Sequence, residues 1–171
     1  MAGLKDIGIR RLEPKHINAG GLILSYVALD NTSNQTFDVT TTMTNIASSD
    51  QTAKITFKAP FSGNIELQIS AYLADLVSTA RILYMSIGTD STYSDSNSSA
   101  NEKTVHQTDE SDDVIINTSW VLTGLTPGTS YTYYIAAKSS ANSNHTFYWG
   151  NTRQPFIIRA VSLPSTIVTD N

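Results

Sequence analysis

Few side chains in this sequence of 171 residues could take part in catalysis or bind a metal ion. The candidates are three histidines and four clustered carboxylates: His16, His106, His145, Asp109, Glu110, Asp112 and Asp113. The histidines are far apart and lack metalloprotease spacing, so a shared metal would need convergence in space. The carboxylates could offer oxygen ligands to calcium, but their spacing is not that of a known calcium loop. We expect isolated histidines in polar loops and a solvated acidic loop, and the question of a ligand or metal on that loop stays open.

Sequence motifs for catalysis or cofactor binding are also absent. The chain has no cysteine, so disulfides and thiolate metal sites are impossible. It has no glycine-flanked serine elbow, no phosphate loop and no dinucleotide fingerprint. We therefore expect a protein that is not an enzyme and that carries no cofactor.

Charge and hydropathy limit the possible partners. Charged residues make up 15% of the chain and the formal net charge is -4, whereas nucleic-acid binding needs a basic surface. The N-terminal residues have no apolar core of signal-peptide length, and the longest apolar stretch, 22–29, is too short to span a bilayer. The sequence therefore predicts neither a nucleic-acid partner nor a membrane partner, and no signal peptide or transmembrane segment.

The elements that must position these residues are short strands. Apolar and polar residues alternate in runs bounded by Gly, Pro, Asn and Asp, which is the pattern of half-buried strands. The clearest runs are 55–58, 65–71, 82–87, 120–122, 131–137 and 156–161, with further strands at 20–29 and 37–44. Strands without intervening helices predict an all-β, antiparallel β-sandwich, either a jelly roll or an immunoglobulin-like fold.

The chain divides into an N-terminal arm with the first strands at 1–50, a sandwich body at 51–164 and a short exposed tail at 165–171. Within the body, residues 88–113 form a polar, acidic stretch without apolar periodicity, which predicts a long loop. The leader is locally basic and precedes an apolar strand. Its candidate subunit-contact residues are Lys5, Arg10, Arg11, Lys15, Leu22 and Leu24. A solvated terminus is the alternative for this arm.

The aromatic residues permit two interpretations. Tyr93, Tyr148 and Trp149 could form a ligand surface, because aromatic faces stack on sugars and bases. In the run 131–137, strand alternation sends Tyr131 and Tyr133 to one face and the next tyrosine to the other. One face of that strand is therefore expected to be core.

The residues Leu125, Pro127, Gly128 and Tyr131 resemble the tyrosine corner of fibronectin type III and other immunoglobulin-like sandwiches. In that motif the tyrosine hydroxyl reaches back to the chain just upstream and fixes the crossing between the sheets. The resemblance covers residues 118–143 and implies a structural role for Tyr131.

A broader resemblance covers residues 52–164. The segments 55–67, 122–131, 149–150 and 155–164 look like the small β-domains of virion proteins of tailed phages, notably marine phages. That resemblance implies a non-enzymatic component of a virion, often a homotrimer, which contacts the major capsid protein or tail proteins.

Within a virion, two functions are open. A capsid decoration or cement protein would bridge shell subunits through residues 1 to about 30. A tail or fibre adhesin would bind host surface glycans through the 88–113 loop and the aromatic residues near Trp149. We favour the decoration protein, because a fibre usually carries a repetitive or heptad shaft ahead of its head and the sequence shows no such segment.

Overall fold

The computed structural model describes residues 21–75, 81–92, 101–108, 112–141 and 145–165. The regular elements in these residues are the strands β1 (Ile23–Leu29), β2 (Gln35–Asp38), β3 (Thr44–Asn45), β4 (Lys54–Lys58), β5 (Ile65–Asp75), β6 (Arg81–Gly88), β7 (Lys103–Thr108), β8 (Asp112–Leu122), β9 (Ser130–Ser139), β10 (His145–Trp149) and β11 (Phe156–Ser162). The described residues contain no helix that is long and apolar enough to cross a membrane. The expected all-β fold is confirmed.

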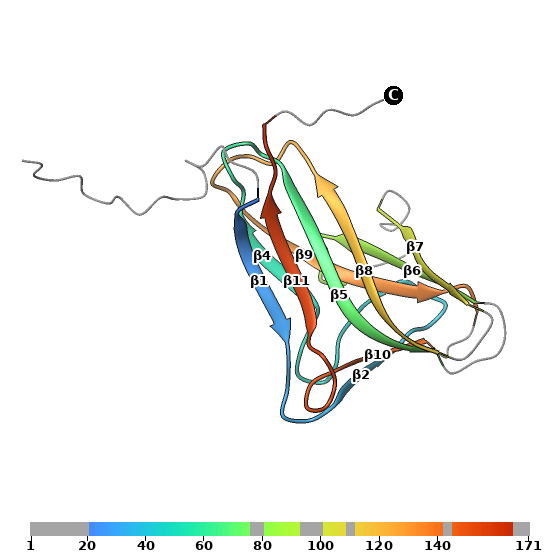
Figure 1. The fold of residues 1–171 in the computed structure, drawn as a ribbon. Helices are drawn as coiled ribbons and strands as arrows, with labels where there is room; N and C mark the ends of the chain where they lie inside the picture. Colours follow the sequence, from blue (N-terminus) through green and yellow to red (C-terminus); the bar gives the residue numbers. More distant parts are fainter. Residues whose placement is uncertain (1–20, 76–80, 93–100, 109–111, 142–144, 166–171) are drawn as a thin grey trace, which may run out of the picture.

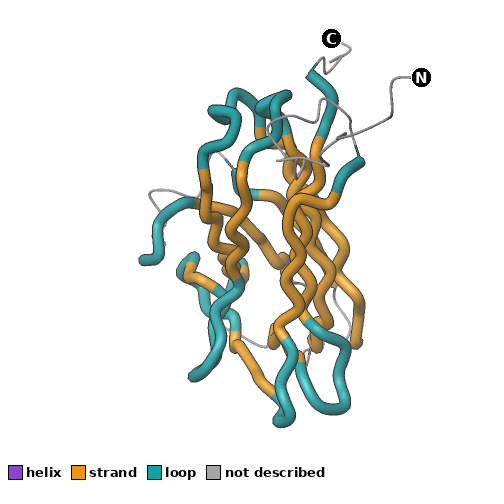
Figure 2. The backbone as a smooth tube through the Cα atoms, turned by 90° about the vertical axis from the view of Figure 1, so that its left-hand side faces the viewer, coloured by secondary structure: helices purple, strands orange, loops and turns teal. Residues whose placement is uncertain are grey.

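The strands form two antiparallel sheets that pack face to face (Figure 1 and Figure 2). In the first sheet, β1 pairs with β11, β11 with β5, and β5 with β8. Strand β10 pairs with β5 beyond the end of β11, and β2 pairs with β10. The second sheet has the order β4–β9–β6–β7, and β3 pairs with β9 beyond the end of β4. At the two edges of the sandwich, β1 contacts β4 and β7 contacts β8.

The path of the chain between the sheets is that of a jelly roll. Leaving aside β2, β3 and β10, the chain runs through β1, β4, β5, β6, β7, β8, β9 and β11. These strands form the sheets β1–β11–β5–β8 and β4–β9–β6–β7, so that the last strand lies between the first and third of them. Double-sheet jelly rolls have eight strands folded as two Greek keys. Of the two expected sandwiches, the jelly roll is therefore the one observed.

The core lies between the sheets and follows from strand alternation. In β4 and β11 every second residue is buried. The largest fully buried side chains include Trp149, Phe147 and Phe156. The Phe156 ring meets the Phe147 ring at 5.8 Å and the Trp149 ring at 6.2 Å, both edge to face. This geometry favours aromatic pairs beyond the area they bury.

Both ends of the described chain lie at one end of the sandwich, at the top of Figure 1. Gly21 N donates to Ser162 O at 2.7 Å, which holds the start of β1 beside the end of β11. The turns β4–β5 and β8–β9 lie at the same end, where Leu125 N donates to Gly63 O at 2.9 Å. The start of β1, the end of β11 and these two turns therefore lie together at one end of the sandwich.

Three predicted boundaries are wrong. The stretch 88–113 is not one loop, because it contains β7 and the start of β8. Sequence periodicity missed β7 because it is a mostly polar edge strand, in which Val105 packs against the core. The predicted strand 37–44 is interrupted between β2 and β3. No boundary separates residues 21–50 from the body, because β1 is a strand of the first sheet. The leader 1–20 and the tail 166–171 lie outside the described residues.

Candidate functional site

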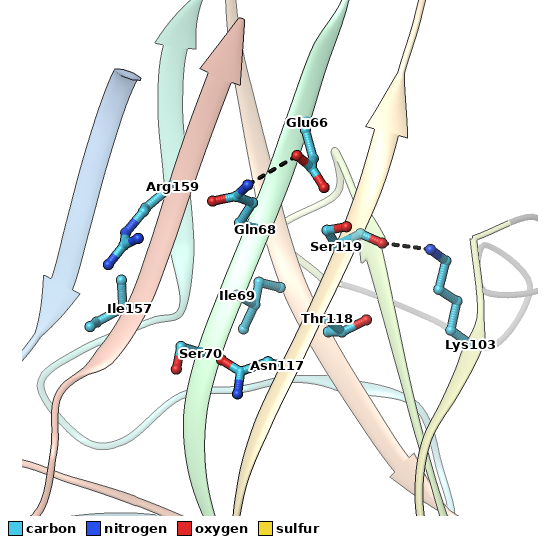
Figure 3. A pocket seen from close by; sticks show the side chains of 10 residues that line it. All are labelled: Glu66, Gln68, Ile69, Ser70, Lys103, Asn117, Thr118, Ser119, Ile157 and Arg159. Carbon is cyan, nitrogen blue, oxygen red and sulfur yellow. Dashed lines mark hydrogen bonds between the residues drawn. The ribbon is translucent and has the colours of Figure 1, made fainter. Parts of the chain in front are cut away.

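A shallow groove of about 570 Å³ crosses the outer face of the first sheet (Figure 3). It is lined by Glu66, Gln68, Ile69, Ser70, Lys103, Asn117, Thr118, Ser119, Ile157 and Arg159. Most of the lining comes from alternate, outward positions of β5, β8 and β11. Ile69 and Thr118 are intervening residues of β5 and β8, and Lys103 belongs to β7. The volume is within the range of small-molecule sites. This groove is the candidate functional site.

Amides and hydroxyls form the centre of the groove. Gln68 lies directly opposite Ser119, and Ser70 lies opposite Asn117. Gln68 Nε2 donates to Glu66 Oε2 at 3.0 Å (Figure 3). An amide can donate and accept at the same time, as can a hydroxyl. The centre can therefore bind a ligand that carries many hydroxyl groups.

Two cations flank this centre. Arg159 lies over the exposed ring of Tyr26, with 5.5 Å between the guanidinium carbon and the ring centroid. On the other side, Lys103 Nζ donates to the backbone oxygen of Ser119 and lies 5.3 Å from the centroid of the Trp120 ring. Cation–π contacts orient both side chains. Neither contact neutralises the charge of the cation. The lining therefore holds two cations and one carboxylate, Glu66.

A third cation forms a cluster with two tyrosines beyond the groove. Arg153 lies over the rings of Tyr72 and Tyr148, at 4.7 Å and 5.6 Å from their centroids, and its Nη1 donates to Tyr72 Oη at 2.7 Å. The Tyr72 hydroxyl donates to Asp113. This hydrogen bond to Asp113 raises the pKa of Tyr72, burial adds to the rise, and Arg153 opposes it. The hydroxyl is therefore held as a donor.

The predicted ligand surface is only partly on the outside. Trp149 is fully buried in the core, and its Nε1 donates to Gln51 Oε1 at 2.7 Å. Tyr148 faces outward and packs edge to face against Tyr72 at 6.2 Å. Tyr93 lies outside the described residues. The prediction for Trp149 is wrong because adjacent residues of a strand point to opposite faces of the sheet.

The predicted contact arm is described only at its end. Lys5, Arg10, Arg11 and Lys15 lie outside the described residues. Leu22 is exposed, whereas Leu24 packs against the core. The register of β1 on β11 shifts between Ile23 and Ser25, which turns Leu24 inward. Leu24 is therefore a core residue and not a free contact.

The tyrosine of the predicted corner makes the contact that defines that motif. Tyr131 Oη accepts a hydrogen bond from Thr126 N at 3.0 Å. Gly128 has φ of 77°, which the turn before β9 requires, and its N donates to Ala59 O at 2.9 Å. Leu125 packs against the core, and the Tyr131 ring stacks on Phe57 at 6.3 Å. Pro127 lies exposed in the same turn.

The histidines are not isolated in polar loops. His106 lies in β7 and His145 in β10, and their rings meet edge to face at 6.1 Å. His145 is fully buried, and its Nδ1 lies 3.3 Å from Ser139 Oγ. Sequence separation concealed this pairing, because the two strands belong to different sheets. His16 lies outside the described residues.

The acidic cluster gives no metal site in the described residues. Asp109 and Glu110 lie outside them, Asp112 begins β8, and Asp113 accepts the bond from Tyr72. Across the part of the chain that the structure describes, no three His, Asp or Glu side chains gather in a group that could hold a metal ion.

Sequence reasoning missed the groove. Its polar residues alternate with core residues in β5, as Glu66, Gln68 and Ser70 do. That alternation shows an outward polar row. It does not show that Arg159, far along the chain, lies beside Gln68. The groove could be recognised only once the pairing of β5 with β8 and β11 was known.

Comparison with known proteins adds little. No family model and no curated protein matches the sequence. Among solved structures, the CBM22-1–GH10 modules of Clostridium thermocellum xylanase 10B, complexed with xylohexaose, match with a TM-score of 0.35 and 8% identity over 91% of this chain and 30% of that chain. Infectious bursal disease virus strain Gx matches with a TM-score of 0.33 and 6% identity over 81% of this chain and 40% of the other. The chain spans less than half the length of either protein, and its class is defined by its own fold, a jelly-roll β-sandwich.

Proposed function

We propose that this protein is a structural component of a tailed-phage virion, a decoration protein that attaches to the capsid shell and bridges its subunits. The phage resemblance in residues 52–164 supports the setting. The jelly roll supports it too, since viral capsid proteins use this architecture, although fold alone does not decide function. In this proposal the protein acts by binding and not by catalysis.

The observation that carries the proposal is a group of exposed apolar side chains near the chain ends. They are Leu22, Ile23, Phe61 and Val121, which are 38% to 58% exposed. Ile23 pairs with Val161, Val161 with Glu66, and Glu66 with Val121, so Ile23 and Val121 lie in one row across the first sheet. Exposed apolar groups that cluster mark interaction surfaces. We call the four exposed apolar residues Leu22, Ile23, Phe61 and Val121 the docking end.

The chain supplies a matched pair of variants for testing the docking end. Val121 and Ile115 both lie in β8, an even number of residues apart, and both are about half exposed. Val121 belongs to the docking end and Ile115 does not. We expect Val121→Ser to weaken attachment to phage particles stripped of the protein at least fivefold, and Ile115→Ser to leave it unchanged. The measurement is the fraction of full-length protein that co-sediments with the particles.

Two outcomes would overturn the decoration role. One is imaging of the virion that places the protein on the tail. The other is equal attachment of Val121→Ser and the unmodified protein. The basic leader is tested separately, because deletion of residues 1–20 should also weaken attachment if Lys5, Arg10, Arg11 and Lys15 contact the shell.

A homotrimer is part of the proposal. Sandwich domains on virus particles meet around three-fold axes, and the docking end offers apolar area for a neighbour. Light scattering of the free protein should give three times the mass of the 18.6 kDa chain. A monomer at micromolar concentration would remove this part of the proposal without affecting attachment to the shell.

The second candidate is a tail or fibre adhesin that binds host surface glycans. The polar groove favours it, because amides and hydroxyls lie together on an open face. The glycan contacts predicted from the sequence included the aromatic residues near Trp149, and only part of that set fits the structure. Tyr148 lies near this face, whereas Trp149 is in the core. Location of the protein on the particle separates the two candidates.

A further inference from the structure

We propose that the groove on the outer face of the first sheet binds an oligosaccharide that carries carboxylate groups. This inference goes beyond the decoration role and applies whether the protein lies on the shell or on the tail. It rests on three features of the groove: the spacing of its polar centre, an exposed aromatic side chain, and flanking cations that form no ion pair with a described carboxylate.

The polar centre has the spacing that sugar hydroxyls require. Side chains directly opposite each other on paired strands lie about 5 Å apart, and successive outward residues of one strand lie about 7 Å apart. Gln68, Ser70, Asn117 and Ser119 therefore form a flat grid of donors and acceptors. In the described part of the chain, the side chains of Ser70 and Asn117 have no hydrogen-bond partner and remain free for a ligand.

Tyr26 supplies an apolar surface beside this grid. Tyr26 is 51% exposed, although Arg159 lies over its ring. The C–H face of a pyranose packs on an aromatic ring in the same way that apolar groups do. A sugar whose hydroxyls reach Gln68 can therefore rest against Tyr26.

The cations select a charged ligand. Arg159 Nε is buried and has no hydrogen-bond partner among the described residues. A buried donor without a partner costs free energy that a ligand can recover. Lys103 has a backbone oxygen and the Trp120 ring as its contacts, and neither carries a charge. Arginine forms paired hydrogen bonds with carboxylates, so an acidic sugar fits these flanks better than a neutral one.

Two carboxylates of this face, Glu66 and Asp113, lie too far apart to form the pair that glycosidases use. Glu66 lies at one end of the groove and Asp113, opposite Ala74, lies beyond the other. The eight strand positions between Glu66 and Ala74 correspond to about 26 Å. Glycosidases place their two carboxyl groups within about 10 Å of each other. These two carboxylates therefore cannot act together on a glycan bound in the groove.

The direct test is calorimetric titration of the full-length protein with defined hexasaccharides. The probes are hexamers of galacturonic acid and of N-acetylneuraminic acid, with neutral maltohexaose and a single-stranded DNA hexamer as comparisons. We expect one acidic hexamer to bind, at least tenfold more tightly than maltohexaose and the DNA, with affinity that falls as salt is added. No binding of either acidic hexamer at millimolar concentration, or equal binding of the neutral sugar or the DNA, would overturn the proposal.

Three variants locate the site. Arg159→Gln and Asn117→Asp should each weaken binding of the acidic hexamer at least tenfold, the first by loss of a cation and the second by added repulsion. Lys54→Gln is the control, because Lys54 also lies over a tyrosine, Tyr134, but in the second sheet. Unchanged affinity in Arg159→Gln and Asn117→Asp, with unchanged thermal unfolding, would contradict the site. None of these residues belongs to the docking end, so particle attachment and glycan binding fail separately.

Discussion

The two faces of the first sheet use the same kinds of residue for different purposes. On the inner face, Trp149 and Phe147 are fully buried and contact Phe156. On the outer face, Tyr148 and Tyr72 contact a cation and an exposed carboxylate. Tyr148 and Trp149 are neighbours in the sequence. Position in the strand, and not residue type, therefore decides whether an aromatic side chain packs in the core or lies on the outer face.

This difference separates stability from binding. The inner face determines whether the jelly roll forms, because its apolar side chains are buried only when the two sheets pack together. The outer face can change its amides, hydroxyls and cations at little cost to folding. Binding sites placed on a fold in this way are why one architecture serves many functions.

The largest expected effect comes from truncating the two neighbours in β10. Trp149→Ala should lower the free energy of unfolding by about 3–5 kcal/mol, because it leaves a cavity against Phe156 and removes the bond to Gln51. Tyr148→Ala should lower it by less than about 1 kcal/mol, because the ring is outside the core. Denaturant unfolding measures both values. Similar losses in the two variants would show that the faces do not differ as described.

The turn after β10, which directly follows Trp149, provides the next test. Gly150 has φ of 85°, and a Cβ there would lie 2.7 Å from the Ser33 backbone oxygen. Gly150→Ala should cost about 2 kcal/mol or more, since left-handed backbone strain and the clash add. Gly124→Ala is the matched control, with φ of 72° and no atom within 4 Å, and should cost about 1 kcal/mol. Equal unfolding midpoints would show that contact with the Ser33 loop does not matter.

The strands with a regular inner face could be predicted from the sequence. In β4, β5, β9 and β11, apolar residues recur at every second position, as a half-buried strand requires. Strand β7 could not be found this way, because it is a mostly polar edge strand with Val105 as its core contact. The groove was equally hidden. Its residues meet through pairing of β5 with β8 and β11, and no local pattern specifies which strands pair.

In the second sheet, Tyr131 and Tyr134 of β9 also lie on opposite faces of one strand, so they test the difference between the two faces again. Tyr131→Phe keeps the ring on Phe57 but removes the acceptor for Thr126 N. We expect a loss of about 1 kcal/mol, the usual contribution of one hydrogen bond. Tyr134→Phe, on the opposite face of β9, should cost less than about 0.5 kcal/mol. Thermal unfolding followed by circular dichroism is sufficient. A Tyr131→Phe variant as stable as Tyr134→Phe would leave the corner without an energetic role.

The smallest effect concerns two tyrosines whose pKa values are raised for different reasons. Burial raises the pKa of Tyr133, with Tyr131 adding to it, whereas the hydrogen bond to Asp113 is the first cause for Tyr72. Asp113→Asn should therefore return the pKa of Tyr72 toward its ordinary value and leave that of Tyr133 unchanged. NMR titration of the ring carbons of both tyrosines measures this. A shift at Tyr133 as large as that at Tyr72 would contradict the separation of causes.

The raised pKa of Tyr133 also sets the sign of a stability change at high pH. Below pH 10 the phenol is protonated in both the folded and unfolded chains, so its contribution is complete. Above pH 10 the unfolded chain releases this proton first, and stability falls as pH rises toward the folded pKa, by at most about 1.4 kcal/mol per pH unit. Tyr133→Phe should make the fall between pH 10 and 11 shallower by a few tenths of a kcal/mol. The free energies of unfolding of the variant and the unmodified protein are measured with denaturant at pH 10 and 11. An equal decrease in both proteins would show that ionisation of Tyr133 does not affect stability.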